Sequence, residues 1–399
     1  MSQESRDKDQ KKYMAELDKA QSFSRMVFDQ FKKNRAALFG AYTILVFILV
    51  ALSAPLITYV TGIDPSTVNA INRYKPPMSR IVVSSDGKES SLKAFIESQP
   101  PEKIEQLKNQ LLEKQVVRPP SPEDALYEWV QLPIPEAISS LDKLDTDLKA
   151  ELKSMITSFE KLHVLGTDDL GRDVLMRLIY GTQVSMGVGI LATLVSALVG
   201  LIIGSLAGYY GGVLDTILMR ITDSMLALPI LPVLVVIAAI DLKKLPLLDS
   251  IAQGGNESII KMVFVLCIFS WMTVARLVRG SILSLREREF ILASKTLGAS
   301  DSTIIIRHMF PNVIGPMLVS ITLGVGQLIL FEAALSFLGL GIQPPTPSWG
   351  NMLFNAQELI YQAPYLAIFP GMLIFLVVVS FNFFGDGLQD AVDPKSVRR

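Results

Sequence analysis

The sequence has few of the side chains from which enzyme and metal sites are usually built. Among its 399 residues there is one cysteine, Cys267, and there are two histidines, His163 and His308. A single cysteine excludes a disulfide framework within the chain and a metal cage made of thiolates. The sequence also lacks a Gly-x-x-x-x-Gly-Lys-(Ser/Thr) loop for nucleotide phosphates. We therefore expect no catalysis, no metal and no cofactor on this chain.

Charged residues are scarce as well. Only 19% of the residues are Asp, Glu, Lys or Arg, whereas soluble proteins carry about 25%. The hydrophobic share is 50%, the mean hydropathy is +0.40 and the formal net charge is −1. This balance offers no basic surplus for nucleic acid and indicates a protein embedded in a lipid membrane.

Six segments are long and apolar enough to cross a membrane, which takes about 20 residues. They are residues 38–60, 183–207, 223–240, 259–277, 313–335 and 365–384. The third is the least regular, because Pro229 and Pro232 remove backbone donors within it. We expect an all-α polytopic membrane protein with six transmembrane helices.

The distribution of lysine and arginine beside the spans indicates the orientation. Lys32, Lys33 and Arg35 precede the first span, and the connection between the fourth and fifth spans is strongly basic. The connection between the fifth and sixth spans has no lysine or arginine. Lys243 and Lys244 point the other way but are outnumbered. We expect both termini in the cytoplasm.

A polar insert, residues 61–163, separates the first two predicted spans and is expected outside the cytoplasm. It contains ten of the chain's 22 prolines. The segment "RIVVSSDGKESSLKAF" predicts a hairpin around Asp86 and Gly87, and two later segments have helical spacing. We expect a small α/β extracytoplasmic domain with its own core. Its predicted inward-facing residues are Leu107, Leu111, Leu152 and Phe159.

The stretch "LASKTLGASDSTIIIRHMFPN", residues 292–312, joins the fourth and fifth predicted spans. Residues 286–297 fit a helix with Phe290, Ala293 and Leu297 on one face. Gly298 is suited to end that helix in the left-handed conformation. The sequence therefore predicts a helical elbow at Gly298.

A second short helix is predicted after this glycine. Ser300 or Asp301 can cap its first turn, and Pro311 marks a boundary before the fifth span. Such an amphipathic pair of helices can lie on lipid or fill a groove on a soluble partner. The residues alone leave both possibilities open.

The same stretch resembles the EAA loop of ATP-binding-cassette (ABC) importer permeases. That loop has a Glu-Ala-Ala core, a glycine four residues after the last alanine, and then Ile-x-x-His-x-(Leu/Phe)-Pro. Leu292 stands where the family has the glutamate. The matching positions are Ala293, Ser294, Gly298, Ile305, His308, Phe310 and Pro311. The resemblance implies that the loop is a coupling helix, which docks in a groove of an ATPase subunit.

The resemblance extends along most of the chain. The segments "LGTDDLGRDVLMRLIYGT", "AGYYGGVLDTILMRITD", "ARLVRGSILSLRERE", "LSFLGLGIQPPTPSWGNML" and "FNFFGDGLQDAVDP" are similar to the dipeptide, oligopeptide and nickel permease branch. They are typical of the C-type subunit of its heterodimer. The resemblance implies the type I ABC importer permease fold. It also implies a second permease subunit, two cytoplasmic ATPase subunits that bind ATP and Mg, an extracytoplasmic substrate-binding protein, and a peptide substrate.

These features divide the chain into five predicted regions in the cytoplasmic (inner) membrane. Residues 1–35 form a cytoplasmic N-terminal segment with an elbow helix, and residues 36–60 form the first transmembrane helix. The insert follows at residues 61–163. The permease core occupies residues 164–385, with the cytoplasmic coupling loop at 281–312, and residues 386–399 form a cytoplasmic tail. We expect the insert to cover the external mouth, where it assists docking of the binding protein or shields the entrance.

Glu332 is a candidate for the translocation path, because an acid within a membrane span is a functional candidate. It lies near the outer end of the fifth span and can meet the amino terminus of a peptide there. It can equally pair with a neighbouring helix or with backbone donors around residues 339–341. The "LGTDDLGRD" segment poses a similar choice between a salt-bridged turn and a gate. Its charged residues are Asp168, Asp169, Arg172 and Asp173.

The predicted function is that of a membrane-spanning permease subunit that imports short peptides, with ATP hydrolysed by its partners. Import of nickel or another small solute is the alternative within the same class. A secondary transporter working without ATPases needs ionisable groups inside the membrane, and Glu332 alone fits that need. An inert anchor for the insert is disfavoured by the prolines and glycines within the spans.

Overall fold

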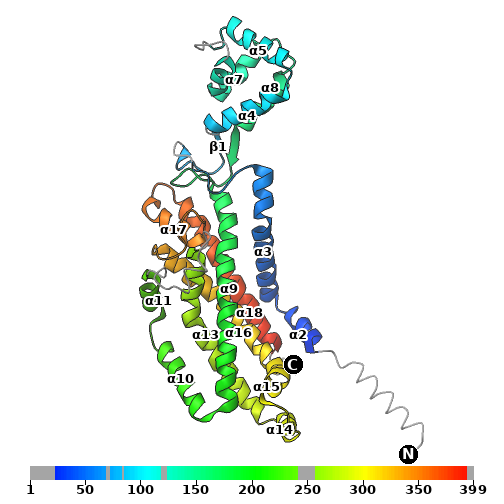
Figure 1. The fold of residues 1–399 in the computed structure, drawn as a ribbon, viewed down its shortest axis with the longest axis vertical. Helices are drawn as coiled ribbons and strands as arrows, with labels where there is room; N and C mark the ends of the chain where they lie inside the picture. The colour runs from blue at the N-terminus through cyan, green and yellow to red at the C-terminus, as the bar shows by residue number, and fades with distance from the viewer. Residues whose placement is uncertain (1–22, 69–71, 83–84, 118–123, 241–256, 393–399) are drawn as a thin grey trace, which may run out of the picture. The chain divides into compact units, whose positions relative to one another are not determined.

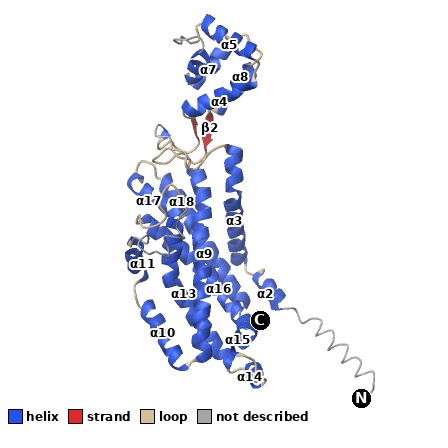
Figure 2. Cartoon of the chain, in the orientation of Figure 1, coloured by secondary structure: helices blue, strands red, loops and turns tan. Residues whose placement is uncertain are grey.

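The computed structural model describes residues 23–68, 72–82, 85–117, 124–240 and 257–392 (Figure 1). They form two compact units, Thr58–Arg177 and a second unit made of Met1–Ile57 and Leu178–Arg399. We call the first the insert unit and the second the permease unit. Among the described residues both strands belong to the insert unit (Figure 2). Lys243 and Lys244, which bear on the predicted orientation, and residues 393–399 of the predicted tail lie outside the described residues.

The permease unit is built from helices, two of which, α3 and α9, extend across its boundary. They are α2 (Phe23–Phe31), α3 (Arg35–Thr61), α9 (Val174–Tyr210), α10 (Gly212–Leu226), α11 (Ile230–Ala239), α13 (Glu257–Arg286), α14 (Glu289–Thr296), α15 (Asp301–Thr303), the π-helix η4 (Ile304–Met309), α16 (Phe310–Phe337), α17 (Trp349–Ala356), the 3₁₀-helix η5 (Gln357–Leu359) and α18 (Tyr365–Val392). The chain is therefore an all-α polytopic membrane protein apart from the small sheet in its insert.

Five helices are long and apolar enough to cross a membrane. They are α3, α9, α13, α18 and the continuous helical segment Asp301–Phe337, which contains α15, η4 and α16. The helices α10 and α11 pass the same test only as a pair, and they are bent by 88° relative to each other. The described residues therefore contain up to six spans.

The prediction of a single third span at residues 223–240 is wrong in its form. Helix α10 ends at Leu226, and α11 begins at Ile230 after Pro229, whose backbone is extended (φ −68°, ψ 106°). A residue before proline avoids the helical region, so the chain turns at this point. Pro232 lies in the first turn of α11, where its missing N–H costs nothing. The sequence therefore contains two helices where one was expected.

The two ends of the described chain pack together in the permease unit. The ring of Phe31 in α2 makes an edge contact with Phe384 in α18 at 5.2 Å between centroids. A Cβ at Gly387 would lie 2.1 Å from that of Ala37. The first and last described helices, α2 and α18, are therefore in contact with each other.

Three glycines allow α9 and α13 to approach closely. Gly200, Gly204 and Gly208 recur every four residues on α9, so they form one stripe of the helix. A Cβ at Gly204 would lie 2.5 Å from the carbonyl oxygen of Ala275 and 2.9 Å from Cβ of Val278. Small residues spaced by four let backbones pack against each other within a membrane. The stripe therefore fixes α9 against α13.

The insert unit contains a two-stranded sheet and five helices among its described residues. Strands β1 (Ser79–Val82) and β2 (Glu160–His163) are antiparallel, with Ser79 opposite His163 and Val82 opposite Glu160. The helices between them are α4 (Ser85–Ser98), α5 (Pro101–Glu113), α6 (Ala125–Gln131), α7 (Ile134–Leu141) and α8 (Lys149–Ser158). The unit extends beyond the predicted insert because the turn at Gly166 and Thr167 bonds back to Lys75.

The predicted hairpin around Asp86 and Gly87 is wrong, whereas the predicted core is confirmed. Both residues lie in the first turn of α4, and β1 pairs with a strand about 80 residues later in the sequence. The Asp-Gly signal is local and does not reveal a distant partner strand. All four residues predicted to face inward, Leu107, Leu111, Leu152 and Phe159, are buried in one cluster around Trp129.

Candidate functional site

The elbow between α13 and α16 is a pair of short helices joined at Gly298. Helix α14 ends at Thr296, and Gly298 has the positive φ of +83° that its sequence position predicts. The N–H of Gly298 donates to the carbonyl of Lys295, and that of Ala299 donates to the carbonyl of Ser294. These two bonds satisfy the last carbonyls of α14 and fix the direction in which the chain leaves it.

The start of the second helix agrees with the prediction in position but differs in its contacts. Ser300 occupies the N-cap position, yet its hydroxyl contacts that of Thr303 at 2.8 Å. The carboxylate of Asp301 accepts a hydrogen bond of 2.6 Å from the hydroxyl of Tyr209, at the end of α9. The ammonium of Lys295 lies 5.2 Å above the ring of the same tyrosine. The elbow is therefore tied to α9 as well as to the helices beside it in sequence.

Pro311 does not end the helical segment, contrary to the expectation of a boundary. The segment continues from Asp301 to Phe337, and six residues before the proline form the π-helix η4. Pro311 is in the first turn of α16, where a missing N–H is tolerated. A π-helical turn adjusts the backbone bonding locally, so the proline is accommodated without a break.

One face of the elbow is buried against the bundle. Ile291 in α14 and Ile304 in η4 are fully buried in a cluster with Val278, Ile282 and Met309. Ile305 is partly buried against the same cluster. A push on the elbow therefore acts on α13 and α16 through close-packed side chains, which transmit displacement well.

Other positions of the elbow leave large apolar side chains exposed. Phe290 is 47%, Leu292 52%, Leu297 87% and Ile306 67% exposed. We call these four residues the elbow patch. Exposed apolar side chains of this size are candidates for contact with a partner. Leu292 is the residue that replaces the family's glutamate, and the structure places it in this patch.

The remaining predicted coupling residues lie beside the elbow patch in the sequence. Ala293 and Pro311 are exposed, whereas Ser294 and His308 are partly exposed. The carbonyl of His308 accepts a hydrogen bond of 2.7 Å from Asn312. The structure thus gathers all seven predicted positions on one short elbow, and their coupling role remains a prediction.

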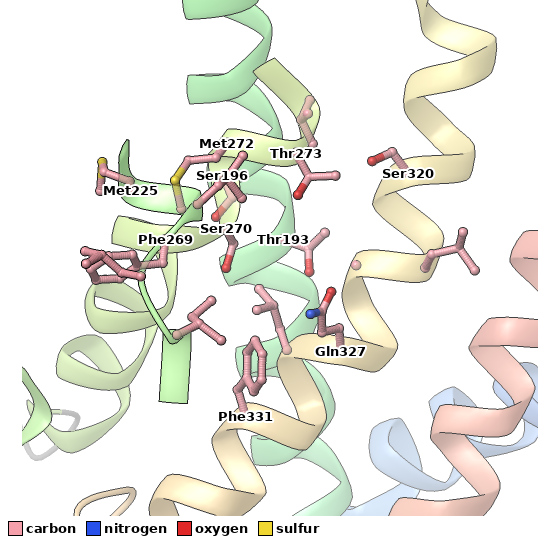
Figure 3. Close-up of a pocket in the computed structure, with 17 residues that line it drawn as sticks. Thr193, Ser196, Met225, Phe269, Ser270, Met272, Thr273, Ser320, Gln327 and Phe331 are labelled. Atoms are coloured by element: carbon pink, nitrogen blue, oxygen red, sulfur yellow. The ribbon is translucent and has the colours of Figure 1, made fainter. Parts of the chain in front are cut away.

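A cavity of about 340 Å³ in the permease unit is lined by residues of α9, α10, α11, α13 and α16 (Figure 3). Helix α9 contributes Thr193 and Ser196, and α16 contributes a stripe that includes Ser320 and Gln327. The break between α10 and α11 forms another wall, and Phe269 of α13 lies nearby. Sequence reasoning missed this cavity, because its walls come from segments up to 138 residues apart.

Glu332 is not among the residues that line this cavity. It is fully buried, and its Oε1 accepts a hydrogen bond of 2.8 Å from the hydroxyl of Ser336 one turn later. The hydroxyls of Ser185 and Ser348 lie beside the same carboxylate. Its neighbours are therefore hydroxyl groups, and the donors predicted at residues 339–341 are not its partners in the described contacts. A role in the translocation path remains a prediction.

The segment around Glu332 joins α9, α16 and α17. Ser336 also accepts from the backbone N–H of Ile342 at 3.2 Å, and Ser185 accepts from that of Trp349 at 3.1 Å. Trp349 itself is fully buried and donates from Nε1 to the carbonyl of Leu178. These bonds hold the connection between α16 and α18 firmly against the bundle.

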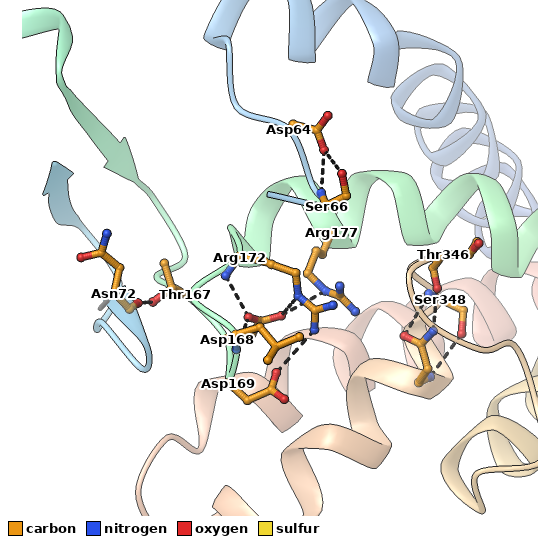
Figure 4. Close-up of polar contacts among 12 residues, drawn as sticks. Asp64, Ser66, Asn72, Thr167, Asp168, Asp169, Arg172, Arg177, Thr346 and Ser348 are labelled. Carbon is orange, nitrogen blue, oxygen red and sulfur yellow. Dashed lines mark hydrogen bonds and ion pairs between the residues drawn. The ribbon is translucent and has the colours of Figure 1, made fainter. Parts of the chain in front are cut away.

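The charged residues of "LGTDDLGRD" form the salt-bridged turn that was one of its two interpretations (Figure 4). Asp168 accepts from Arg172 Nε at 2.8 Å and lies 3.3 Å from Arg177 Nε. Asp169 lies 3.5 Å from Arg172 Nη2. Burial, followed by the neighbouring charge of Asp168, raises the pKa of the Asp169 carboxyl. The alternative role as a gate remains a prediction.

His163, one of the two histidines of the chain, contacts the same turn. Its Nδ1 lies 2.6 Å from Asp173 Oδ2, and both side chains are largely buried. The other carboxylate oxygen of Asp173 accepts from the N–H of Met176 in the first turn of α9. The contacts around Asp173 therefore stabilise the start of α9.

Comparison with known protein families identifies two matching regions of the chain. The family described as "Binding-protein-dependent transport system inner membrane component" matches residues 200–398. A second, described as "N-terminal TM domain of oligopeptide transport permease C", matches residues 22–77. Residues 78–199, which contain most of the insert unit, lie between the two matched regions.

Individual relatives agree with these families. The chain is 42% identical over 233 residues to the dipeptide transport system permease protein DppC of Alkalihalophilus pseudofirmus, covering 58% of this chain and 72% of that protein. It is 42% identical over 233 residues to the glutathione transport system permease protein GsiD of Pectobacterium atrosepticum, covering 58% and 73%. A solved structure of the inward-facing MetNI methionine ABC transporter aligns with a TM-score of 0.43 at 19% identity, covering 54% of this chain and 96% of that one.

Proposed function

As the chain belongs to the binding-protein-dependent transport system inner membrane components, in the dipeptide and oligopeptide branch of the ABC importer permeases, we propose that it imports short peptides. It does so as one of two permease subunits in the cytoplasmic membrane. Two ATPase subunits bind ATP and Mg in the cytoplasm, and an extracytoplasmic binding protein delivers the peptide. Both termini and the elbow lie on the cytoplasmic side.

The observation that carries this proposal is the elbow patch on a tightly packed elbow. Its apolar side chains offer an ATPase groove a helix-in-groove contact. Ile291 and Ile304 lie on the opposite, buried side and pass movement to α13 and α16. An ATPase pair that binds one arrangement of the elbow more tightly shifts the helices toward that arrangement. Leu292 makes this an apolar contact where the family has an acid.

The lining of the cavity favours a peptide over a bare metal ion. Among the described residues, the polar side chains on its walls are hydroxyls and one carboxamide, beside two methionine thioethers, with no carboxylate, imidazole or thiol. Nickel is bound preferentially by imidazole and thiolate groups. Hydroxyl and amide groups instead match the N–H and C=O groups of a peptide.

The test is uptake of a labelled tripeptide by cells that carry this chain in place of their own peptide permease. We expect Leu297→Asp to lower uptake at least about tenfold and to prevent co-purification with the ATPases, because a charge is placed in an apolar contact. Ser284→Asp, at an exposed site on α13, is the matched control and should change neither. The amount of each chain in the membrane is measured in parallel.

Two results would overturn the proposal. If Leu297→Asp retains normal uptake and still co-purifies with the ATPases, the elbow patch is not the coupling surface. If deletion of the chain abolishes nickel-dependent growth while peptide uptake survives, nickel import is the better assignment.

A further inference from the structure

The cavity of the permease unit is polar without being charged. The 17 residues that line it in the described part of the chain include no Asp, Glu, Lys, Arg or His. The polar ones come from α9, α13 and α16, and the close-up shows them around one space (Figure 3). They are Thr193, Ser196, Ser270, Thr273, Ser320 and Gln327. Each of these side chains can both donate and accept a hydrogen bond.

Part of this hydrogen-bonding capacity is already used within the protein. Thr193 donates to the carbonyl of Gly189 and Ser270 to that of Leu266, both at 2.7 Å. Their hydroxyl oxygens still have lone pairs that can accept. These two residues are therefore potential acceptors at the cavity wall.

Other groups have capacity to spare. The hydroxyl of Ser196 is buried and forms no hydrogen bond of normal length with the described residues. The Cys267 thiol, a weak acceptor, lies beside it. The carboxamide of Gln327 is exposed and has two donors and an acceptor. Gln327 thus presents an exposed polar group at the cavity wall, whereas the hydroxyl of Ser196 is closed off from the cavity.

The pattern along α16 keeps the nearest acid away from this space. Ser320, Gly324, Gln327 and Phe331 follow one another at helical spacing and line the cavity. Glu332 follows directly but belongs to the next face of the helix, where Ser336 bonds it. A fixed charge inside a low-dielectric space would attract opposite charges and repel like charges strongly. The helix therefore presents an amide to the cavity and directs its carboxylate elsewhere.

We infer that this cavity is a charge-neutral subsite for the peptide group of the substrate, in which the Gln327 carboxamide exchanges hydrogen bonds with the substrate backbone. The subsite does not distinguish peptides by the charge of their side chains, because the polar group that Gln327 presents to it is uncharged. Its volume of about 340 Å³ is near the lower end of the range of roughly 300–1,000 Å³ for ligand pockets. It therefore suits a short stretch of peptide. The inference rests on the proposed peptide import and adds the chemistry of recognition.

The experiment introduces a charge of either sign at Gln327 and measures uptake of Ala-Ala-Ala, Ala-Glu-Ala and Ala-Lys-Ala by the complete transporter. Each rate is divided by that of the unsubstituted protein for the same peptide, so that selection by the binding protein cancels. Gln327→Glu should lower uptake of Ala-Glu-Ala at least about tenfold more than that of Ala-Lys-Ala. Gln327→Lys should reverse the order.

Two further variants control for position and folding. Gln357→Glu makes the same change at an exposed glutamine outside the cavity and should leave all three ratios near one. Ser320→Asp adds an acid to the cavity from the same helix and should act in the same direction as Gln327→Glu. If Gln327→Glu does not accumulate in the membrane, the result for Ser320→Asp tests the charge-neutral subsite in its place.

The outcomes separate this inference from the function on which it rests. If the unsubstituted protein imports none of the peptides, the proposed function fails and this inference fails with it. If it imports all three, but charges at residues 327 and 320 change every ratio equally or change none, the charge-neutral subsite is refuted and peptide import stands.

Discussion

Adding one methyl group to the glycine stripe should loosen the helix bundle, and the size of the effect follows from the structure. A Cβ at Gly204 would lie 2.5 Å from the Ala275 carbonyl oxygen and 2.9 Å from Cβ of Val278. Both distances are shorter than van der Waals contact, and one of the atoms is backbone. Helices α9 and α13 must therefore move apart in Gly204→Ala. Overpacking of this kind costs about 1–3 kcal/mol.

The same helix offers a matched control. Gly187 also lies in α9, and a Cβ built there meets no atom within 4 Å. Gly187→Ala should stabilise the chain by roughly 0.5–1 kcal/mol, because alanine is the better helix former. The two variants have the same composition, and they differ only in whether the methyl group faces α13.

The chain contains its own reporter for the measurement. Cys267 in α13 is the single cysteine and is partly buried. Its reaction with a thiol-specific fluorogenic dye during heating therefore follows the opening of the bundle in detergent. At about 2–4 °C for each kcal/mol, Gly204→Ala should melt roughly 2–12 °C below the unsubstituted protein. If Gly204→Ala melts at or above the temperature of Gly187→Ala, the stripe does not hold α9 against α13.

Three further predictions concern single contacts. Tyr209→Phe keeps the ring but removes its charge-assisted hydrogen bond to the elbow, which is worth about 1.5–3 kcal/mol. We expect ATP hydrolysis to continue with less peptide imported per ATP. An unchanged ratio of peptide imported to ATP hydrolysed would contradict this. Glu332→Gln should retain uptake within about twofold, because the residue lies outside the cavity, whereas a variant that melts normally but imports nothing would support a place for Glu332 in the path. Lys88 is buried in the insert unit and donates to the carbonyl of Val130, and burial lowers its pKa. The unfolded chain therefore holds the proton to higher pH than the folded one, so the stability of the insert unit should rise with pH up to the pKa of an ordinary lysine. Lys88→Met should abolish that rise in pulse proteolysis of the full chain at pH 8, 9 and 10, and a rise that persists would assign the dependence to another group.

Local signals in the sequence predicted local structure well. The apolar runs predict the positions of the long helices, and Gly298 adopts the left-handed conformation expected of a glycine after a helix. The apolar spacing at Leu107, Leu111 and Leu152 predicts the core of the insert unit, because amphipathic helices of a small domain have one surface to bury. Each of these features depends on residues within a few turns of one another.

Features that depend on distant residues were not predicted. The hydrogen bond between Tyr209 and Asp301 joins residues 92 apart in sequence. Strand β1 pairs with β2, and five described helices separate the two strands in the sequence. The small and polar stripe of α16 at Ser320, Gly324 and Gln327 is visible in the sequence. Its meaning becomes clear only when α9 and α13 enclose the other sides of the cavity.

The pairing of β1 with β2 has a consequence for how this chain can change over evolutionary time. Opposite residues in an antiparallel pair have Cα atoms about 4.5–5.5 Å apart, so the chain leaves at Val82 and returns at Glu160 almost to the same point. The 77 residues between them can therefore be lengthened, shortened or exchanged without moving either strand. The free energy of closing such a loop grows only slowly with its length. The residues between β1 and β2 can thus diversify as one module while the paired strands at its base stay the same.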